Sequence, residues 1–389
     1  MRLGDVIQVN PESIRAGYPY EQIEYVDISS VGTGTMEGTK SISLDGAPSR
    51  AKRIVRNADT LLATVRPNLR SFLYVRQPST NTIASTGFAV LRATDAIDPR
   101  FLYYTVTNQA FTDYLTANAK GAAYPAVDAD TIKRAEIYLP PLSIQQKIAA
   151  ILSAYDDLIE NNLRRIKILE EMTQNLYREW FVKFRFPGHA KVRMVDSPLG
   201  KIPEGWEVVT LGELVNIPKG KNITKKTIVP GDVPVVAGGI APAYYHNAAN
   251  TRNPVITISA SGANAGFVNL YYHDVWASDC SVIDLSATKY VYYFYLLLKD
   301  RQYEVTRLQR GAAQPHVYPK DLMALDALSV PEEILEFFAR KIGPIFKMIK
   351  NMKEKNKNLH QTRDLLLPKL ISGELDISEL EIDTGKEAA

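Results

Sequence analysis

The stretch Leu139-Pro-Pro-Leu-Ser143 opens about forty residues that contain neither glycine nor proline, and Phe186-Pro-Gly188 closes them. Proline disfavours helix in the residue before it, and Ser143 with Gln146 three positions later has the pattern of a helix N-cap with a capping box. The closing proline and glycine are typical of a helix end. The stretch therefore predicts one long helix, about 57 Å from Ile144 to Phe181 at ~1.5 Å per residue.

Apolar residues inside this helix recur at alternating steps close to a heptad, which predicts a seam for a second helix. The seam consists of Ile148, Ile151, Tyr155, Leu158, Asn162, Leu169, Met172 and Leu176, widened by Ile159, Ile166 and Trp180. A helix of this length needs a partner to cover its apolar stripe. Asn162 is the one polar member, and we expect it to be buried and to fix the register of the pair.

A second long helix is predicted from Pro331 onward, where Val330-Pro-Glu-Glu-Ile334 has proline at the first helical position and two acids at the positive end of the dipole. Its apolar stripe continues through Ile334, Phe337, Phe338, Ile342, Ile345, Ile349, Met352, Leu359 and Leu366. Gly343-Pro344 is expected to kink or locally break this helix. Each long helix thus follows a block whose sequence does not have the pattern of a long helix.

The two blocks that precede the helices are related to each other. Leu3-Gly-Asp-Val-Ile-Gln-Val resembles Leu211-Gly-Glu-Leu-Val-Asn-Ile, and Gly121-Ala-Ala-Tyr-Pro-Ala-Val resembles Gly311-Ala-Ala-Gln-Pro-His-Val. One such heptapeptide could match by chance. Matches in the same order, with the long helix following each time, indicate an internal duplication.

Each block has short runs of β-branched and aromatic residues between turn formers, together with a candidate helix. The strands are expected in 25–29, 60–65, 87–92, 208–211, 255–259 and 280–285, and the helices after Asp98 and from Tyr290. We therefore predict an α+β fold: two mixed, mainly β domains separated by two long antiparallel helices that form a coiled coil, with pseudo-two-fold symmetry. The predicted boundaries are 1–142 for the first domain, 143–187 for the central helix, 188–330 for the second domain, 331–374 for the C-terminal helix and 375–389 for an acidic, flexible tail.

Composition and motifs favour a protein without a catalytic site. The 389 residues carry a net charge of +3 and are 46% hydrophobic, which is ordinary for a soluble protein of two or more domains. The start lacks the apolar region of a signal peptide, no run could span a bilayer, and the single cysteine excludes a disulfide framework, so we expect a cytoplasmic protein. The histidines lack metal-ligand spacing, and no Walker lysine motif or Gly-x-Ser-x-Gly elbow occurs.

Basic clusters in both blocks favour nucleic acid as a ligand. The segment from Arg50 to Gln77 holds seven basic residues against one acid, Asp59, and Lys219 to Lys226 holds four lysines and no acid. Such clusters neutralise phosphates, while arginine, asparagine and glutamine can read base edges. The alternative is that these are solvated surface loops. Their occurrence in both blocks shifts the interpretation toward DNA.

Six segments occur in order along the chain: Asp59-Thr-Leu-Leu-Ala-Thr-Val-Arg-Pro-Asn, Ala84-Ser-Thr-Gly-Phe-Ala-Val-Leu, Leu139-Pro-Pro-Leu-Ser-Ile-Gln-Gln-Lys-Ile-Ala-Ala-Ile-Leu, Glu179-Trp-Phe-Val-Lys-Phe-Arg-Phe-Pro-Gly, Ile202-Pro-Glu-Gly-Trp-Glu and Leu366-Leu-Pro-Lys-Leu-Ile-Ser-Gly-Glu-Leu. Together they resemble the specificity (S) subunit of Type I restriction-modification systems over almost the whole length. One segment departs from that family: Val330-Pro-Glu-Glu-Ile-Leu-Glu-Phe-Phe stands where a Pro-x-x-x-Gln-Gln-x-Ile pattern is usual. We therefore expect this helix to dock differently in detail.

The resemblance implies a non-catalytic DNA sequence-recognition subunit of an adenine-DNA methyltransferase and endonuclease complex. Two target recognition domains would read an asymmetric bipartite target on double-stranded DNA. The helices would span the unread spacer and dock methylation (M) subunits, two in number, and a restriction (R) subunit. No cofactor is expected in this chain, since S-adenosylmethionine would bind the partner methylation subunit. The residues expected to bind DNA are Arg53, Arg66, Asn68, Arg70, Thr86, Lys120, Tyr124, Lys219, Lys221, Lys225, Lys226, Ser261, Asn264, Arg310 and His316.

Two other functions remain open at this point. The chain could be a stand-alone DNA-binding or scaffold protein without a methylase partner, or an enzyme with an unfamiliar site. No Asn-Pro-Pro-Tyr/Phe tetrapeptide of the adenine methyltransferase type occurs, because Leu flanks Pro140-Pro141 on both sides and Val follows Asn253-Pro254. This favours a chain that does not itself transfer methyl groups.

Overall fold

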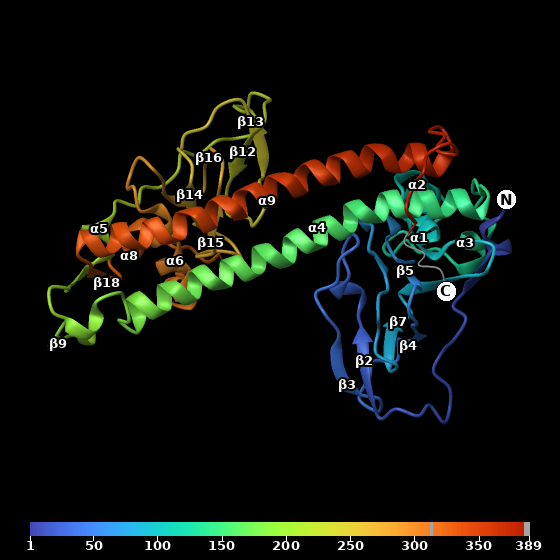
Figure 1. Cartoon of the computed structure of the whole chain (residues 1–389), viewed down its shortest axis with the longest axis horizontal. Coiled ribbons are helices and arrows are strands. Elements are labelled where there is room, and N and C mark those ends of the chain that lie inside the picture. The colour runs from blue at the N-terminus through green and yellow to red at the C-terminus, as the bar shows by residue number, and fades with distance from the viewer. Residues whose placement is uncertain (312–313, 385–389) are drawn as a thin grey trace. The chain divides into compact units, whose positions relative to one another are not determined.

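The computed structural model describes residues 1–311 and 314–384, and its contacts divide the chain into two units (Figure 1). Unit 1 comprises Met1–Asn161 and Asn356–Ala389, and unit 2 comprises Asn162–Lys355. Each unit therefore contains one of the two repeated blocks together with part of each long helix. Residues 385–389, the end of the predicted acidic tail, lie outside the described residues.

Over its described residues, unit 1 contains two four-stranded sheets and three short α-helices. The first sheet has the order β1 (Ile7–Val9), β8 (Phe88–Ala93), β5 (Thr60–Ala63) and β6 (Phe72–Tyr74), all antiparallel. The second has the order β3 (Lys40–Ser43), β2 (Gln22–Val26), β7 (Thr82–Ser85) and β4 (Ala51–Ile54), with β2 and β7 parallel. Helices α1 (Pro99–Thr107), α2 (Gln109–Ala117) and α3 (Ala129–Arg134) complete the block. The Asp98 side chain caps α1 as expected, accepting from the backbone of Arg100 and Phe101.

Unit 2 repeats this arrangement with sheets of three strands in place of four. One sheet has the order β15 (Val268–Tyr271), β14 (Val255–Ser259) and β17 (Cys280–Ile283), and another has β13 (Tyr244–His246), β12 (Val233–Val236) and β16 (Trp276–Ala277). Strands β12 and β16 are parallel, like β2 and β7 of unit 1. Two ribbons, β9 (Met194–Ser197) with β10 (Gly200–Pro203) and β11 (Glu207–Thr210) with β18 (Asp326–Ser329), and helices α5 (Leu211–Leu214), α6 (Val291–Asp300), α7 (Gln302–Arg307) and α8 (Pro319–Met323) make up the rest.

Equivalent hydrogen bonds in the two units confirm the internal duplication. The amide of Leu3 donates to the carbonyl of Ala135 at 2.8 Å, and the amide of Leu211 donates to Leu325 at the same distance. Both leucines are fully buried. The acceptors stand 190 positions apart, which is also the offset between the two Gly-Ala-Ala heptapeptides.

The glycine that follows each of these leucines has a packing reason. A Cβ on Gly4 would lie 2.8 Å from Cβ of Lys133, and one on Gly212 would lie 2.9 Å from Cβ of Met323. Contacts that short are not tolerated, so each block keeps glycine where its first turn meets its last short helix. The matching Leu-Gly pairs in the sequence therefore mark one shared packing contact.

The two long helices are α4 (Leu142–Tyr177), continued by a π-helical turn over Arg178–Val182, and α9 (Glu332–Ser372). They pair antiparallel inside each unit. In unit 1 Asp156 of α4 bonds to Arg363 of α9 at 2.5 Å, and the carbonyl of Ile159 accepts from Asn356 at 3.3 Å. The pairing in unit 2 joins Glu170 to Lys353 at 3.1 Å and sets the ring of Trp180 5.5 Å from that of Phe337. The α+β fold with an antiparallel helix pair is thus as predicted.

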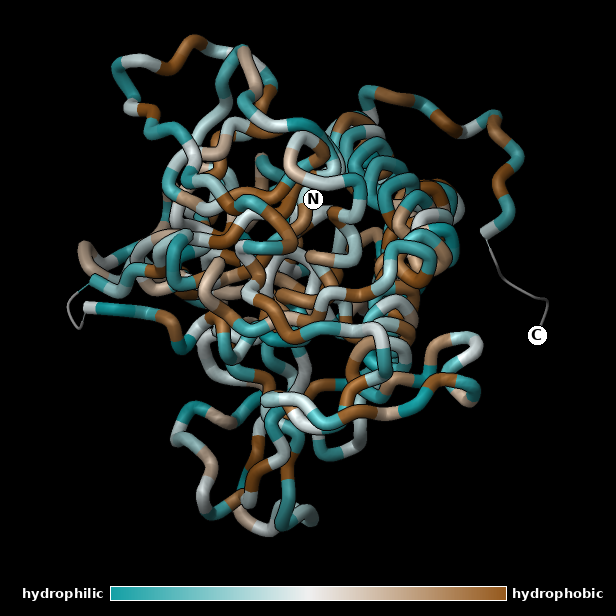
Figure 2. The backbone as a smooth tube through the Cα atoms, turned by 90° about the vertical axis from the view of Figure 1, so that its left-hand side faces the viewer, coloured by the Kyte–Doolittle hydropathy of each residue, from teal (hydrophilic) through white to brown (hydrophobic). Residues whose placement is uncertain are grey.

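The predicted seam of α4 is partly wrong. Leu158 and Met172 are exposed, at 36% and 51%, whereas residues seven apart form the buried face: Leu152, Ile159, Ile166, Thr173 and Trp180. Alternating hydrophobic and hydrophilic segments are visible along the helical coils in Figure 2. Asn162 is buried, as expected, and its effect on register stays a prediction.

Helix α4 begins earlier than predicted, and the predicted local break of α9 does not occur, whereas a kink there stays a prediction. Helix α4 begins at Leu142, because the amides of Ile144 and Gln145 donate to the carbonyl of Pro141, so Ser143 lies inside the first turn and is not the N-cap. Helix α9 runs through Gly343-Pro344 without a break. Pro344 lies on the exposed face, where water can solvate the carbonyl that loses its amide partner.

After α9 the described part of the tail packs against the core of unit 1. Ile377 is buried at 3% in the core that contains Ile148, Leu152 and Leu370. The Lys147 ammonium donates to the carbonyl of Ser378 at 2.7 Å. The chain is therefore held against α4 for several residues beyond the end of the helix.

Candidate nucleic-acid interface

In unit 1, two residues that follow β5 adopt a backbone conformation that only glycine adopts easily. Strand β5 is fully buried, and the chain then enters a short 3-10 turn over Pro67–Leu69. The residues on either side, Arg66 and Arg70, have φ values of 51° and 55°. Each such residue costs on the order of 1–3 kcal/mol, so the surrounding structure must hold the turn in place.

A hairpin of the same unit holds this turn. Lys120 and Ala126 exchange two backbone hydrogen bonds of 2.9 Å, and the carbonyl of Pro125 accepts from the amide of Arg66 at 2.7 Å. The Arg66 guanidinium lies 4.7 Å from the centre of the Tyr124 ring, which is 70% exposed. Together, residues 66–70 and hairpin 120–126 form what we call the turn site of unit 1.

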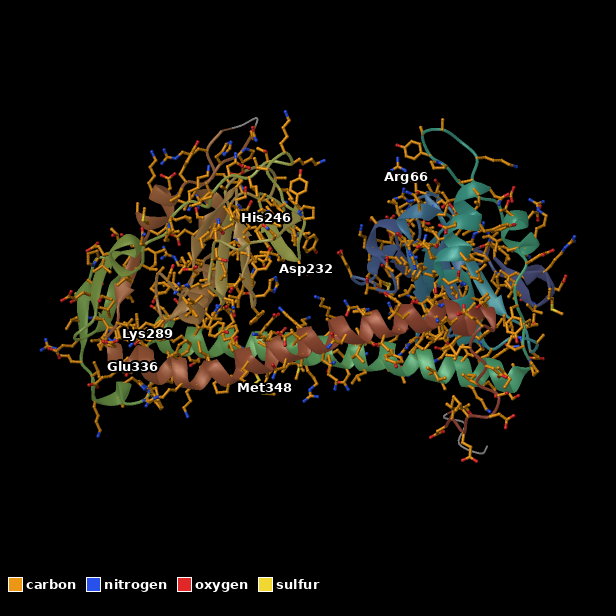
Figure 3. All side chains as sticks on the ribbon, turned by 90° about the horizontal axis from the view of Figure 1, so that it is seen from above. Arg66, Asp232, His246, Lys289, Glu336 and Met348 are labelled. Carbon is orange, nitrogen blue, oxygen red and sulfur yellow. The ribbon has the colours of Figure 1, made fainter. Side chains whose placement is uncertain are left out.

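The second arginine of the turn is engaged inside the unit. Arg70 donates to the carbonyl of Thr107 at 2.9 Å, contacts the side chain of Gln109, and lies 5.6 Å from the ring of Phe72. Arg70 therefore joins the turn to the start of α2. Figure 3 shows Arg66 on unit 1 close to the hairpin loop, on the side away from the long helices.

Unit 2 builds the same framework from different residues. Arg310 and His316 exchange backbone hydrogen bonds of 2.8 and 2.9 Å, and the carbonyl of Pro315 accepts from the amide of Gly262 at 3.0 Å. Gly262 has φ +78° and thus takes the position that Arg66 has in unit 1. The turn 260–264 and hairpin 310–316, whose residues 312–313 lie outside the described ones, form the turn site of unit 2.

Two polar side chains of the unit 2 turn site, Ser261 and Arg310, and the neighbouring Lys219 are paired with acids. Ser261 hydrogen-bonds to the Asp279 carboxylate, and the Lys219 ammonium lies 3.5 Å from the same group. Arg310 forms a 2.6 Å ion pair with Asp321, whose side chain is 10% exposed. Neither acid was among the predicted residues. Asp279 stands directly before buried strand β17, and that position was the one available signal in the sequence.

Of the remaining predicted residues, Asn68 and Asn264 lie within the two turn sites, whereas Arg53 and Thr86 lie outside them. Arg53 is on β4 of the other sheet and donates to Ser13 at 3.3 Å. Asn68 and Thr86 are exposed, and Thr86 precedes Gly87, whose carbonyl accepts from Thr64 at 2.9 Å. The carbonyl of Asn264 accepts from the amide of Phe267.

Three predicted lysines of unit 2 are exposed in the loop before β12. Lys225 lies 5.6 Å from the ring of Tyr244, and the carbonyl of Lys221 accepts from the Trp276 indole at 2.9 Å. Lys226 is also exposed. The structure therefore brings together the following predicted residues: Arg66, Asn68, Arg70, Lys120 and Tyr124 in unit 1, and Lys219, Ser261, Asn264, Arg310 and His316 in unit 2.

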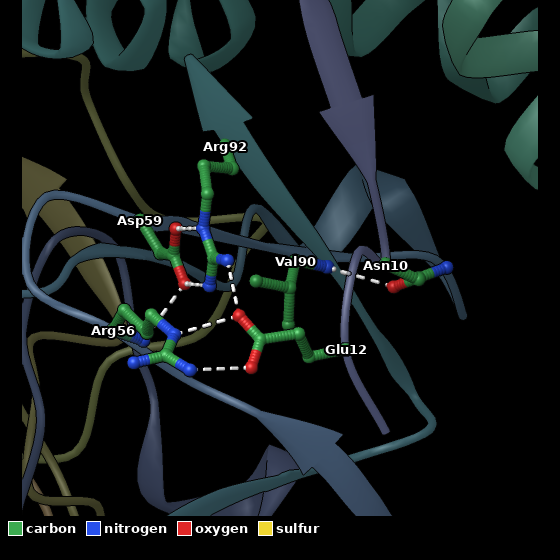
Figure 4. A network of polar contacts seen from close by, with 6 residues as sticks. All are labelled: Asn10, Glu12, Arg56, Asp59, Val90 and Arg92. Carbon is green, nitrogen blue, oxygen red and sulfur yellow. Dashed lines mark hydrogen bonds and ion pairs between the residues drawn. The ribbon is translucent and has the colours of Figure 1, made fainter. Parts of the chain in front are cut away.

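Long-range ion pairs reduce the free charge of the basic cluster in unit 1. Figure 4 shows Arg92 bound to both oxygens of the fully buried Asp59, while Glu12 bridges Arg92 and Arg56. Hydrogen bonds from Arg56 and then Arg92 lower the pKa of Glu12 to about 2. Besides Arg56, two of the seven basic residues between Arg50 and Gln77 have acidic partners. Arg50 pairs with Asp27 and Arg76 with Asp157, both at 2.7 Å. Counting basic residues in the sequence therefore overstated the charge available to DNA.

The described residues offer little for catalysis. Within 1–311 and 314–384, no group of three or more His, Cys, Asp or Glu side chains could hold a metal ion. Burial raises the pKa of the Cys280 thiol to about 12, so it carries almost no reactive thiolate at neutral pH. Over the same residues, no helix is long and apolar enough to cross a membrane.

Comparison with known proteins agrees with this geometry. The family model for the Type I restriction modification DNA specificity domain matches residues 1–171 and 203–360. The Type I restriction enzyme MjaIX specificity subunit of Methanocaldococcus jannaschii is 28% identical, over 97% of this chain and 88% of that protein. The HindI specificity subunit of Haemophilus influenzae is 23% identical, over 90% and 95%.

A solved structure supports the fold. The S subunit of a Type I restriction-modification system from M. genitalium has a TM-score of 0.60 at 17% identity, covering 95% of both chains. The matched segments of the family model include the turn site of each unit. The chain therefore belongs to the specificity subunits of Type I restriction-modification systems, the subunits that recognise the DNA target.

Proposed function

We propose that this chain reads a bipartite DNA target, with the turn site of each unit contacting one half. The observation that carries the proposal is the duplicated framework with different side chains. The Arg66–Pro125 and Gly262–Pro315 hydrogen bonds are equivalent, yet one turn presents an arginine and the other a glycine. Backbone contacts that match would hold both turns alike, while side chains that differ would select different bases. The two halves of the target should therefore differ.

The chain would act through partner subunits. We propose that methylation subunits, two in number, dock on the long helices, that they bind S-adenosylmethionine, and that a restriction subunit joins the same complex. The helices of unit 2 have exposed apolar side chains that a partner could cover. Ile168 and Met172 lie one turn apart on α4 and are 55% and 51% exposed, and Met348 of α9, labelled in Figure 3, is 44% exposed.

The experiment is to express the chain with its methylation subunit and to map methylated adenines across the genome of the host. We expect one motif with two unlike halves and a gap of unspecified bases. The chain without the methylation subunit should transfer no methyl group. A fully palindromic motif would contradict separate reading by the two units.

A second candidate function is DNA binding without a methylase partner. A pull-down of the chain with the methylation subunit, followed by the same mapping of methylated adenines, would distinguish this function from the first. If the two proteins do not associate and no adenine is modified, while the chain alone binds DNA, the stand-alone function is correct.

A further inference from the structure

We propose that Arg66, held against Tyr124, reads the O6 and N7 edge of a guanine in the DNA target. This inference rests on the proposed function and specifies the chemistry of the unit 1 turn site. The guanidinium would donate two parallel hydrogen bonds to the two acceptors, as arginine does in its commonest specific contact with DNA. Tyr124 would act as a positioning residue.

The first argument is the backbone of Arg66. Its φ of 51° is in the left-handed region, where a side chain costs about 1–2 kcal/mol and glycine costs little. Unit 2 has Gly262 at the equivalent position, with φ +78° and the same bond to the hairpin proline. The framework therefore works with glycine. A side chain kept at this position in spite of its strain indicates a function for that side chain.

The second argument is the way the guanidinium is held. Its Cζ lies 4.7 Å from the centre of the Tyr124 ring, and Nη2 donates to the carbonyl of Ala123 at 3.3 Å. A guanidinium has five N–H donors in one plane, so most of its donors remain available in a fixed direction. Other arginines of the unit, Arg50 and Arg92, are paired with carboxylates, whereas the guanidinium of Arg66 contacts an aromatic ring and one backbone carbonyl.

The third argument separates a base from a phosphate as the ligand. A phosphate contact tolerates a mobile cation, and Lys120 of the same hairpin suits it: its side chain is 84% exposed and its nearest acid, Asp128, is 4.0 Å away. Bidentate base reading requires a planar fork in a fixed orientation. Within one turn site, the held arginine would then specify a base and the exposed lysine would bind the backbone.

The experiment measures binding of the chain–methylation subunit complex to its mapped target by fluorescence anisotropy. Each guanine of the target is replaced in turn by 7-deazaguanine, which keeps Watson–Crick pairing but lacks the N7 acceptor. For the natural chain we expect one position to lose about tenfold or more in affinity. In Arg66→Gln the same replacement should change affinity less than twofold. Arg66→Lys should keep part of the sensitivity, because an ammonium can donate to O6 and N7 but lacks the planar fork that fixes both bonds.

Two variants control for folding and for charge. Arg66→Gly removes the side chain while suiting the left-handed backbone, so it should fold and also lose the sensitivity to 7-deazaguanine. Lys120→Gln removes a cation from the same hairpin. We expect it to weaken binding to all sequences alike, to lower the salt dependence, and to keep the sensitivity at the guanine.

Either of two results would overturn the inference. If no 7-deazaguanine position distinguishes the natural chain from the Arg66 variants, Arg66 does not read a guanine. If Arg66→Gln and Arg66→Gly weaken binding to all DNA sequences equally and reduce its salt dependence, Arg66 contacts a phosphate. Failure of the proposed function looks different, because the complex would then bind no specific DNA at all.

Discussion

In unit 1 the amide of Arg66 bonds to the hairpin at Pro125, and in unit 2 the amide of Gly262 bonds to the hairpin at Pro315. Around this shared bond the chemistry differs. Unit 1 offers a guanidinium against an exposed tyrosine, whereas unit 2 offers Ser261 and cations that are already paired with acids. The backbone framework is thus common to both units, and the side chains that face outward from it are specific to each.

The docking of the long helices also differs between the units. Gln145 of α4 is 1% exposed, donates to the carbonyl of Pro140 at 2.8 Å, and accepts from the amide of Asp98 at 2.8 Å. The position 190 residues later is Leu335 of α9. There the exposed Lys289 pairs instead with Glu332 at 2.8 Å and Glu336 at 3.1 Å. Lys289 and Glu336 are labelled in Figure 3. The two long helices therefore dock on their blocks through different contacts.

A third difference lies below the turn sites. In unit 1 the buried Asp59, directly before strand β5, accepts a hydrogen bond from the amide of Arg56 at 2.8 Å. In unit 2 the corresponding amide, that of Arg252, donates to Asp284 at 2.8 Å, which follows strand β17. Both units place a buried carboxylate on the same turn but supply it from different strands. These differences allow each unit to be tested separately.

The largest effect is expected from Asp59→Ala. It removes the partner of the Arg92 guanidinium and the acceptor of the Arg56 amide, and breaking a buried pair costs on the order of 3–5 kcal/mol. Only unit 1 should lose this stability. All three tryptophans lie in unit 2, so their fluorescence follows unit 2, while far-UV circular dichroism follows both. In urea, the dichroism transition should begin well before the fluorescence transition.

The matched control is Asp196→Ala in unit 2. Its carboxylate is 87% exposed and pairs with Lys201 at 3.0 Å, so the variant should unfold like the natural chain. Coincident transitions for Asp59→Ala, unchanged from those of the natural protein, would show that the buried pair does not stabilise unit 1.

The loss of unit 1 stability at low pH should be smaller than the effect of Asp59→Ala, and it should depend on Glu12. Its pKa is about 2 in the folded chain against 4.5 when unperturbed, because Arg56 and Arg92 donate to it. A lowered pKa gives stability that is complete above the unfolded value and disappears as pH falls toward the folded value. The dichroism transition of unit 1 should therefore weaken between pH 4.5 and 2. Glu12→Gln should be less stable at pH 7 and should lose less on acidification.

A second group keeps some acid dependence in that variant. Burial opposes the ionised form of Asp27, but hydrogen bonds from Ser29, Tyr25 and Arg50 outweigh it and lower its pKa to about 2. Glu12→Gln should thus reduce the slope of stability against pH without abolishing it. Parallel profiles for the variant and the natural chain would exclude Glu12 as a source of the slope.

Gln145→Ala should come next in size. It leaves the amide of Asp98 and the carbonyl of Pro140 unpaired beside the start of α4, which costs about 1–3 kcal/mol. The loss should appear in the dichroism transition alone. Lys289→Ala is the control in unit 2, where the ion pairs are exposed and the fluorescence transition should stay in place. Equal losses in both variants would contradict the difference in docking.

Much of the architecture could be predicted because it repeats. The Leu3 and Leu211 heptapeptides, the two hairpins and the helix after each block all correspond to shared packing contacts. The exact buried face of α4 could not be predicted in this way. Leu158 and Leu152 are both apolar, and packing against the block of unit 1 and the end of α9 decides that Leu152 is buried.

The candidate site was predicted less completely, since its electrostatics depend on residues far away in sequence. Arg56 pairs with Glu12, 44 residues earlier, and Arg76 with Asp157 of α4. No local pattern reveals such pairs. Arg66 was within reach of sequence reasoning as part of a basic cluster, but its strained backbone and its contact with Tyr124 required the structure.

The smallest expected effect tests the strain of the turn directly. Gly262 has φ +78° and no atom within 4 Å of an added Cβ, so Gly262→Ala should cost only the backbone penalty, about 1–2 kcal/mol in the fluorescence transition. Gly262→Asn is its control, since asparagine tolerates the left-handed conformation and should cost less. In unit 1, Arg66→Gly relieves the same penalty and loses a contact with Tyr124 worth about 0.5–1 kcal/mol, so it should leave the dichroism transition unchanged or shift it to slightly higher urea. A clear loss of stability in Arg66→Gly would mean that the arginine is retained to hold the turn, and the strain would then no longer indicate a role in DNA reading.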